Sequence, residues 1–265
     1  MKILLASLVL IFQSYQVFAY SIGTYNLHNM SDLEGLKRDL KNLNHISIFA
    51  FQEVRFRDSD QDNLLLHGIL PVGKYPYVVT QKVAKDDDGN IEGHAIVSKY
   101  PILKSMVIPL EHTDKKNREA LVAWIQIEGR EIMVINTDHE VHYKDISYLD
   151  RRKQILSLIT ALDKINFKGT QILLGDFNTS DSIANWGSGV TGEKEVKLTY
   201  DFFKDRGWQP TYASSEKDYT FQSWGFTQHL DHILFKNSGT DKIKPWLRFN
   251  ERKGSDHYPI YSFFE

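Results

Sequence analysis

The chain has 265 residues, of which 42% are hydrophobic and 12% aromatic, and its formal net charge is -2. This length and composition are those of an ordinary globular protein with a full hydrophobic core. The near-neutral charge excludes bulk attraction to nucleic acid or to an anionic membrane, so contact with a polyanion would depend on local basic patches and bound metal. The candidate patches are residues 115–118, 151–153 and 248–253, and ordinary solvated surface is the alternative for each.

The first residues are typical of a secretory signal. Met1 and Lys2 precede an apolar run at residues 3–12, and small residues suit cleavage after Ala19. This run is short for a membrane span, so we expect a secreted or periplasmic protein without a stable membrane anchor. A retained anchor or a buried first strand is the alternative. The sequence contains no cysteine, so core packing and bound metal would replace disulfides.

Residues 20–265 are expected to form one continuous domain, and the protein is expected to be a monomer. Leucines at helical spacing predict a helix over residues 31–44, with Ser31 as its N-cap and Glu34 completing a capping box. A second helix is predicted over residues 148–165. Apolar and alternating runs predict strands at residues 46–51, 77–83, 91–98, 121–127, 131–137 and 171–174. Helices interspersed with hairpin strands indicate an α/β arrangement in layers.

Short polar motifs stand at the ends of several predicted strands. In Gly175-Asp176-Phe177-Asn178, Asp176 and Asn178 are two residues apart, so both side chains can point into one pocket. Taken alone, the motif is also explained as a turn that closes a strand. Similar clusters occur at Tyr25-Asn26, Gln52-Glu53 and Ser255-Asp256-His257. Carboxylate and amide oxygens at strand ends suit hard cations and phosphate chemistry.

In this order the motifs resemble the endonuclease/exonuclease/phosphatase superfamily, which includes deoxyribonuclease I, neutral sphingomyelinases and abasic-site endonucleases. The resemblance runs from Thr24 to Ile260 and includes Asn136-Thr137 and Leu230-Asp231-His232-Ile233. It implies an α/β fold of the deoxyribonuclease I type, a four-layer sandwich of two packed, mostly antiparallel β-sheets flanked by helices. It also implies a phosphoric ester hydrolase that depends on Mg2+, with Mn2+ or Ca2+ as alternatives.

The resemblance further implies a role for each polar side chain. Glu53 is the expected principal metal ligand, His257 the general base or phosphate ligand, and Asp231 the carboxylate that orients His257. The expected metal ligands are Asn26, Glu53 and Asp256, and the expected catalytic residues are Arg118, His139, Asp176, Asn178, Asp231 and His257. The alternatives are a turn-forming role for Asn26, a plain surface position for Asp231 and a hairpin-mouth charge for Arg118. Glu92 and His94 are further candidates for the floor of the cleft.

One position departs from the family pattern. Family members often place a histidine directly after Asn-Thr, whereas this chain reads Asn136-Thr137-Asp138-His139. Adjacent side chains of a regular strand point to opposite faces, so both cannot enter the cleft. We predict a bulge or strand end that turns His139 toward Asp176 and Asn178 as the leaving-group acid. Asp138 itself and His142 are the alternatives.

The expected function is that of an exported Mg2+-dependent nuclease with nucleic acid as its substrate. The acidic segment at residues 85–90 argues against an apolar hairpin for membrane contact. The alternatives are a sphingomyelinase-like phospholipid phosphodiesterase, a small-molecule phosphatase, and a catalytically silent binding or toxin-adaptor member of the family.

Overall fold

A computed structural model of the chain describes residues 20–56, 64–85, 90–111, 118–139, 147–179, 201–211, 219–223, 226–236, 239 and 242–265. The predicted signal segment 1–19, the acidic tip 86–89, basic residues 115–117 and His142 lie outside these ranges. Within the described part of the chain, no helix is both long enough and apolar enough to cross a membrane.

The first sheet contains six strands and is mostly antiparallel. β1 (Tyr20–Asn26) and β2 (Ile48–Phe56) are its one parallel pair. Its strand order is β13 (Leu247–Arg248), β14 (Ile260–Phe264), β1, β2, β4 (Ile91–Ser98) and β3 (Tyr77–Lys85). The strands predicted at residues 77–83 and 91–98 are confirmed as β3 and β4, which pair antiparallel as a hairpin.

The second sheet also contains six strands, and its one parallel pair is β7 with β8. Its order is β5 (Ile102–Pro109), β6 (Glu119–Ile127), β7 (Arg130–Asp138), β8 (Gln171–Asp176), β12 (Asp231–Lys236) and β9 (Gln209–Pro210). A separate small hairpin consists of β10 (Phe221–Ser223) and β11 (Phe226–Gln228). The two sheets confirm the predicted α/β fold with mostly antiparallel pairing.

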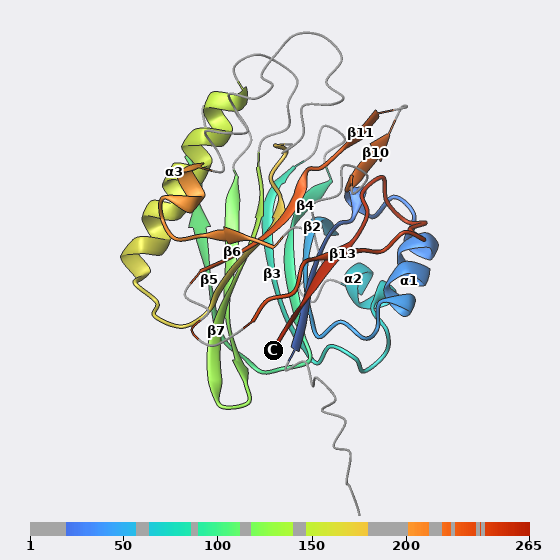
Figure 1. Cartoon of the computed structure of the whole chain (residues 1–265). Helices are drawn as coiled ribbons and strands as arrows, with labels where there is room; N and C mark the ends of the chain where they lie inside the picture. Colours follow the sequence, from blue (N-terminus) through green and yellow to red (C-terminus); the bar gives the residue numbers. More distant parts are fainter. Residues whose placement is uncertain are drawn as a thin grey trace, which may run out of the picture.

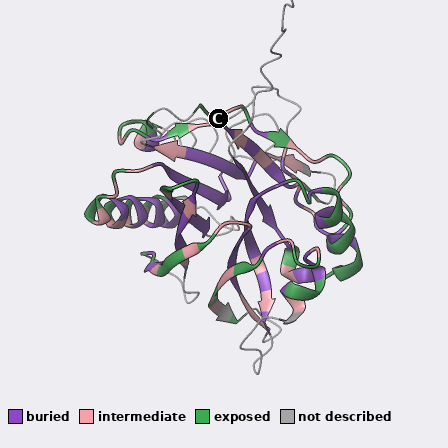
Figure 2. Cartoon of the chain, turned by 90° about the horizontal axis from the view of Figure 1, so that it is seen from below, coloured by how far each residue is buried: buried purple, intermediate pink, exposed green. Residues whose placement is uncertain are grey.

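The helices cover the outer faces of the sheets. α1 (Leu33–Asn42) and α2 (Leu64–Ile69) lie on one side and α3 (Ser147–Ile165) on the other, with a short 3-10 turn, η1 (His28–Met30), after β1 (Figure 1). Figure 2 shows buried strands between helices whose outward faces are exposed. This is the four-layer arrangement that the sequence predicted.

Three apolar clusters hold these layers together. Between the sheets, Ile22 and Ile48 of the first pack with Val134 and Leu174 of the second. The two outer clusters join sheet to helix, in one case Phe49, Phe51, Leu36, Leu40 and Leu66, in the other Met133, Ile135, Leu158, Leu162 and Leu173. Each strand contributes apolar side chains to both faces of its sheet, because successive side chains of a strand point to opposite sides.

The start of α1 differs from the prediction. Asp32, not Ser31, is the N-cap, and its Oδ1 accepts a hydrogen bond from Gly35 N at 2.9 Å. Ser31 instead closes η1, where its N–H donates to His28 O. Both residue types are strong N-caps, so the extra short turn after β1 decided which of them capped the helix.

Candidate active site

Strand register brings three carboxylates to one edge of the second sheet. Asp176, the last residue of β8, lies opposite Asp138 of β7 on one side and Asp231 of β12 on the other. All three are almost completely buried, with at most 5% of each residue exposed. A buried carboxylate requires a cation, a hydrogen-bond donor or a proton, so each must have a partner at this edge.

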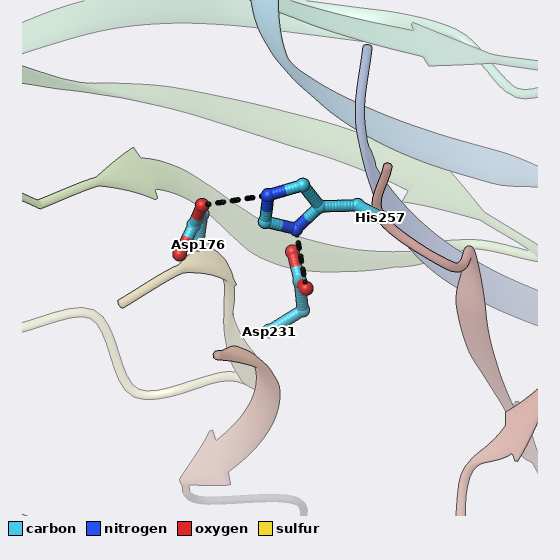
Figure 3. Close-up of side chains that lie close together, drawn as sticks. All are labelled: Asp176, Asp231 and His257. Carbon is cyan, nitrogen blue, oxygen red and sulfur yellow. Dashed lines mark hydrogen bonds and ion pairs between the residues drawn. The ribbon is translucent and has the colours of Figure 1, made fainter. Parts of the chain in front are cut away.

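His257 is the partner of two of these carboxylates. Its Nδ1 lies 2.8 Å from Asp231 Oδ2, and its Nε2 lies 3.6 Å from Asp176 Oδ2 (Figure 3). The ring is therefore held between the two carboxylates, with Asp231 as the closer. Asp231 occupies the orienting position that the sequence predicted for it.

The same neighbours change the proton affinities of this cluster. Burial alone would lower the pKa of His257, but the carboxylates of Asp231 and Asp176 outweigh burial and raise this pKa to about 10. Burial, together with the charges of Asp231 and Glu53, raises the pKa of Asp176 to about 7, although His257 opposes this shift. The arrangement therefore favours a protonated imidazole beside a carboxyl group that titrates near neutrality.

Asn26 is the last residue of β1, whereas Glu53 lies inside its parallel neighbour β2, which continues beyond the predicted strand to Phe56. The Asn26 side-chain amide donates to Glu53 Oε1 at 2.9 Å and to Asp176 Oδ2 at 3.1 Å, while its oxygen accepts from His28 N at 2.9 Å. One amide thus connects a carboxylate of the first sheet with a carboxylate of the second. For Asn26 to act as a metal ligand, its amide would have to turn its oxygen toward the carboxylates.

The backbone at Glu53 is irregular. The register between β2 and β4 shifts between Phe51 and Val54, and Glu53 has a positive φ of 50°. Such a conformation is uncommon for a residue with a side chain, and β-bulges of this kind re-aim side chains next to active sites. The bulge therefore separates Glu53 from the regular alternation of β2 and presents its carboxylate to Asn26.

A buried polar bridge joins the two sheets beneath these residues. Gln52 donates to Asn136 Oδ1 at 2.6 Å, and Asn136 donates to Phe51 O at 2.8 Å and to Ala95 O at 3.0 Å. Gln52 also exchanges hydrogen bonds with Thr24. These contacts fix the relative position of β2 and β7, and with it the distance between Glu53 and the carboxylates of the second sheet.

Arg118 and Asn178 surround the third carboxylate. The Arg118 guanidinium donates to Asp138 Oδ2 at 3.0 Å, and Asn178 Nδ2 donates to Asp138 Oδ1 at 3.4 Å. The Asn178 backbone N–H also donates to Asp176 Oδ1 at 2.8 Å. Burial raises the pKa of Asp138 well above its ordinary value, and the charge of Asp176 adds to this rise against the effect of Arg118.

The predicted position of His139 is wrong. No bulge interrupts β7, whose pairing with β8 stays regular through Asp138 and Asp176. Asp138 therefore enters the site, and His139 turns to the α3 side, where its ring is fully buried and lies edge-on to Phe177 at 5.0 Å between centroids. Neither ring nitrogen has a hydrogen-bond partner among the described residues, and burial lowers the pKa of His139 to about 3. This neutral ring cannot reach a leaving group in the site.

Three further residues that the sequence suggested for the site lie at the margin of the carboxylate cluster. Asp256 is half-exposed, and its Oδ1 lies 3.5 Å from His28 Nδ1. His94 is buried on β4, where its Nε2 contacts Glu119 O at 3.1 Å and burial lowers its pKa to about 4. Glu92 is half-buried two residues earlier on the same strand. The His94 ring is thus a neutral, structural group.

Sequence reasoning missed Asp39. This α1 residue is fully buried, and its carboxylate accepts hydrogen bonds from Lys253 N, Gly254 N and Tyr25 Oη at 2.8 to 2.9 Å. It therefore ties α1 to the segment that carries His257 and to the residue before Asn26. A signal was available, because Asp39 shares the apolar helix face of Leu36 and Leu43, where a carboxylate needs buried donors.

The loop from Lys253 to His257, which Asp39 ties to α1, continues into the site. Ser255 Oγ donates to Asn26 O at 2.8 Å and accepts from His257 N at 3.1 Å. Gly254 packs so closely on α1 that a Cβ there would lie 2.1 Å from Leu36 N. A side chain at residue 254 would therefore push the loop away from the helix and move His257.

The donor set fits a divalent cation. Within the described ranges, Asp176, Asp231 and His257 are the one group of three His, Asp or Glu residues whose ligand atoms lie within 4.8 Å of one another. Asp231 already holds His257, however, so Glu53 and a turned Asn26 amide, both beside Asp176, are better placed as ligands. These are hard oxygen donors of the kind that Mg2+ prefers, and a cation would relieve the repulsion that raises the pKa of Asp176.

Comparison with known proteins agrees with this geometry. The model of the endonuclease/exonuclease/phosphatase family matches residues 23–257. A search of the curated proteins found no match.

Solved structures of the same architecture are distant in sequence. An endonuclease/exonuclease/phosphatase from Beutenbergia cavernae has a TM-score of 0.74 and 16% identity over 93% of this chain and 71% of its own. A family protein from Leptotrichia buccalis has a TM-score of 0.72 and 19% identity over 93% and 99%. Sphingomyelinase C from Streptomyces griseocarneus has a TM-score of 0.64 and 16% identity over 92% and 98%. Identities this low establish the shared fold alone.

Proposed function

Because this chain belongs to the endonuclease/exonuclease/phosphatase family, whose members are phosphoric ester hydrolases, we propose that it is an exported, Mg2+-dependent phosphodiesterase acting on nucleic acid. One observation carries the proposal: His257 lies between Asp231 and Asp176, beside the Asn26–Glu53 pair. That combination provides a proton donor, a proton acceptor and oxygen ligands for a cation in one place. The apolar segment at residues 1–19 supports export.

The pKa values of His257 and Asp176 favour different catalytic roles for the two residues. A ring with a pKa of about 10 is protonated at neutral pH, so His257 donates a hydrogen bond to a phosphoryl oxygen and does not act as the base. Asp176, with a pKa of about 7, accepts the proton of the attacking water. This assignment replaces the base role that the sequence suggested for His257.

The leaving oxygen also needs a proton. As the new bond from water to phosphorus forms and the bond to the leaving oxygen breaks, we assign the supply of that proton to Asp138, the buried group whose pKa is raised well above its ordinary value. Arg118 and Asn178, which both contact Asp138, are placed to hold phosphate oxygens. Glu53 would hold a divalent cation, which would supply further charge relief at the phosphoryl group.

The decisive assay uses the purified chain without residues 1–19. Plasmid DNA, RNA, sphingomyelin, a phosphomonoester and bis(4-nitrophenyl) phosphate are each tested with Mg2+, Mn2+ or Ca2+, and again with excess chelator. We expect metal-dependent cleavage of nucleic acid and slower cleavage of the bis-aryl ester. Faster cleavage of sphingomyelin or of the phosphomonoester would replace the nuclease by one of the alternative enzymes. Inactivity on all five substrates would indicate a catalytically silent member.

A further inference from the structure

Next to His257, arginine and tyrosine side chains form a stacked surface that the proposed chemistry does not use. The guanidinium carbon of Arg248 lies 4.5 Å from the ring centroid of Tyr219 and 4.7 Å from that of Tyr258. The guanidinium carbon of Arg252 lies 4.2 Å from the Tyr258 centroid. The two tyrosine rings meet edge to face at 5.5 Å. We call these four residues the arginine–tyrosine surface.

This surface is joined directly to the candidate active site. Tyr258 follows His257, and its N–H donates to Thr220 O at 2.6 Å. Strand β10 also pairs with His257 through Phe221, whose ring lies 5.0 Å from the imidazole. Successive side chains of extended chain point to opposite sides, so His257 faces the carboxylates while Tyr258 faces outward. There the Tyr258 hydroxyl donates to Gln222 Oε1 at 2.7 Å.

Among the residues that the structure describes, none neutralises the positive charge of this surface. Arg248 donates from Nε to Asn250 Oδ1 and from Nη1 to Tyr219 O, both at 2.7 Å, and these acceptors are neutral. Arg252 donates to the backbone oxygens of Ser255 and Gln222. Across the described residues, no carboxylate lies within ion-pair distance of either guanidinium. Both arginines are half-buried and held by the rings, so their charge is presented in a fixed position.

A fixed cationic surface beside a phosphodiester site selects a substrate with further negative charge. The backbone of a nucleic acid carries a phosphate on either side of the bond to be cut, whereas a phosphocholine headgroup carries a quaternary ammonium. Aromatic faces could hold that ammonium through cation–π contacts, but here guanidinium groups already occupy them and would repel it. The charge and the stacking thus both favour a polyanion.

From this surface we infer that Arg248, held by Tyr219 and Tyr258, binds a nucleic-acid phosphate that flanks the scissile bond. The inference rests on the proposed function and names its specificity-determining residue. Within the described chain Arg248 Nη2 has no acceptor, so it can donate to a phosphate oxygen while Nε and Nη1 keep the side chain in place. Arg252, with both terminal nitrogens bonded to backbone oxygens, positions the loop.

The test compares Arg248→Gln with Arg130→Gln, a matched change at an exposed arginine that begins β7. Kinetics are measured with a short oligonucleotide, which has flanking phosphates, and with bis(4-nitrophenyl) phosphate, which has none. Arg248→Gln is expected to raise KM for the oligonucleotide about tenfold and to reduce the slope of log affinity against log salt by about one. Its kcat/KM for the bis-aryl ester should stay within about twofold of the parent, and Arg130→Gln should change neither.

Two results would overturn the inference: equal oligonucleotide kinetics for the two variants, or equal losses on both substrates for Arg248→Gln. A binding measurement separates this inference from the proposed function. In a His257→Ala background, fluorescence anisotropy of a labelled oligonucleotide reports affinity without hydrolysis. If the parent chain cleaves no phosphodiester but Arg248→Gln still weakens this binding, the surface assignment stands and the proposed hydrolysis fails. Unchanged binding would refute the surface assignment whatever the catalytic result.

Discussion

Asp138 and Asp176 lie directly opposite each other at the ends of the parallel strands β7 and β8. Their carboxylates have separate partners, Arg118 for Asp138 and His257 for Asp176. At the position where the family pattern leads one to expect a histidine, this chain therefore has a buried carboxyl group with its own arginine. The pairing places a group with a strongly raised pKa beside one that titrates near neutrality, as an acid and a base require.

The first prediction concerns Asp138 as the acid that protonates the leaving oxygen. Asp138→Asn keeps the size of the side chain but cannot release a proton, so kcat should fall by about two to four orders of magnitude. His139→Leu should leave kcat within about threefold, because the ring lies on the α3 side. It should also not lower Tm, since it removes two buried ring nitrogens that have no partners within the described ranges. Steady-state kinetics and thermal melts check both, and a larger kcat loss for His139→Leu would reverse the assignment.

The second prediction concerns the Asp231–His257 pair. Because Asp231 is the strongest of the groups that raise the pKa of His257, Asp231→Asn should lower that pKa. The protonated ring is the active form, so the alkaline limb of the kcat/KM profile should move from about pH 10 to a lower pH. Residues that act as a unit lose activity non-additively. The double variant with His257→Ala should be little worse than His257→Ala, and multiplied losses would argue against a shared role.

The third prediction concerns Asp39. Its carboxylate accepts from two backbone N–H groups and one tyrosine hydroxyl, and Asn offers only one acceptor oxygen. Asp39→Asn should therefore reduce the free energy of unfolding by about 1.5–3 kcal/mol. It should also lower kcat, since the segment with His257 loses its attachment to α1. Glu34→Gln, on the exposed face of the same helix, is the control. Unchanged kcat in a folded Asp39→Asn protein would remove Asp39 from the positioning network.

Local sequence patterns predicted β2, β3, β4, β6, β7 and β8 and several of the polar residues near strand ends, but they did not predict β5 or β14. Spacing predicted that Asp176 and Asn178 lie close together, although Asn178 lies beyond β8 in a bend with a positive φ of 46° and not in extended chain. The β2 bulge at Glu53 and the regular end of β7 at His139 were not predictable in this way. In both places a shift of one residue decides which side chain enters the site. That choice depends on pairing with a strand distant in sequence.

Long-range contacts were the other part that sequence patterns could not supply. Asp39 bonds to residues more than two hundred positions later in the chain. The Gln52–Asn136 bridge also depends on how the two sheets pack. The sequence around either residue does not indicate which residue it contacts. Such contacts form only when the layers assemble, so they are properties of the fold and not of a segment.

The fourth prediction is a pH dependence of metal binding. Because the folded-state pKa of Asp176 is about 7, against an ordinary value of 3.8, the folded protein retains this proton after the unfolded chain has lost it. Without metal, this group therefore makes the fold less stable as the pH rises from about 4 to about 7. A cation beside Asp176 favours its ionised form, so Mg2+ should raise Tm more at pH 8 than at pH 5.5. An equal rise at both values would contradict a cation site beside Asp176.

The central claim is that Glu53 and its neighbours hold a divalent cation that hydrolysis requires. The most direct measurement is cleavage of bis(4-nitrophenyl) phosphate and of nucleic acid by the parent chain and by Glu53→Gln, with Mg2+ and with excess chelator, alongside the Tm in each condition. The account predicts that chelation abolishes activity reversibly and that Glu53→Gln loses several orders of magnitude in kcat and most of the Mg2+-induced rise in Tm. Full activity of the parent chain in excess chelator, or a Glu53→Gln protein with unchanged kcat and Mg2+ response, would contradict it.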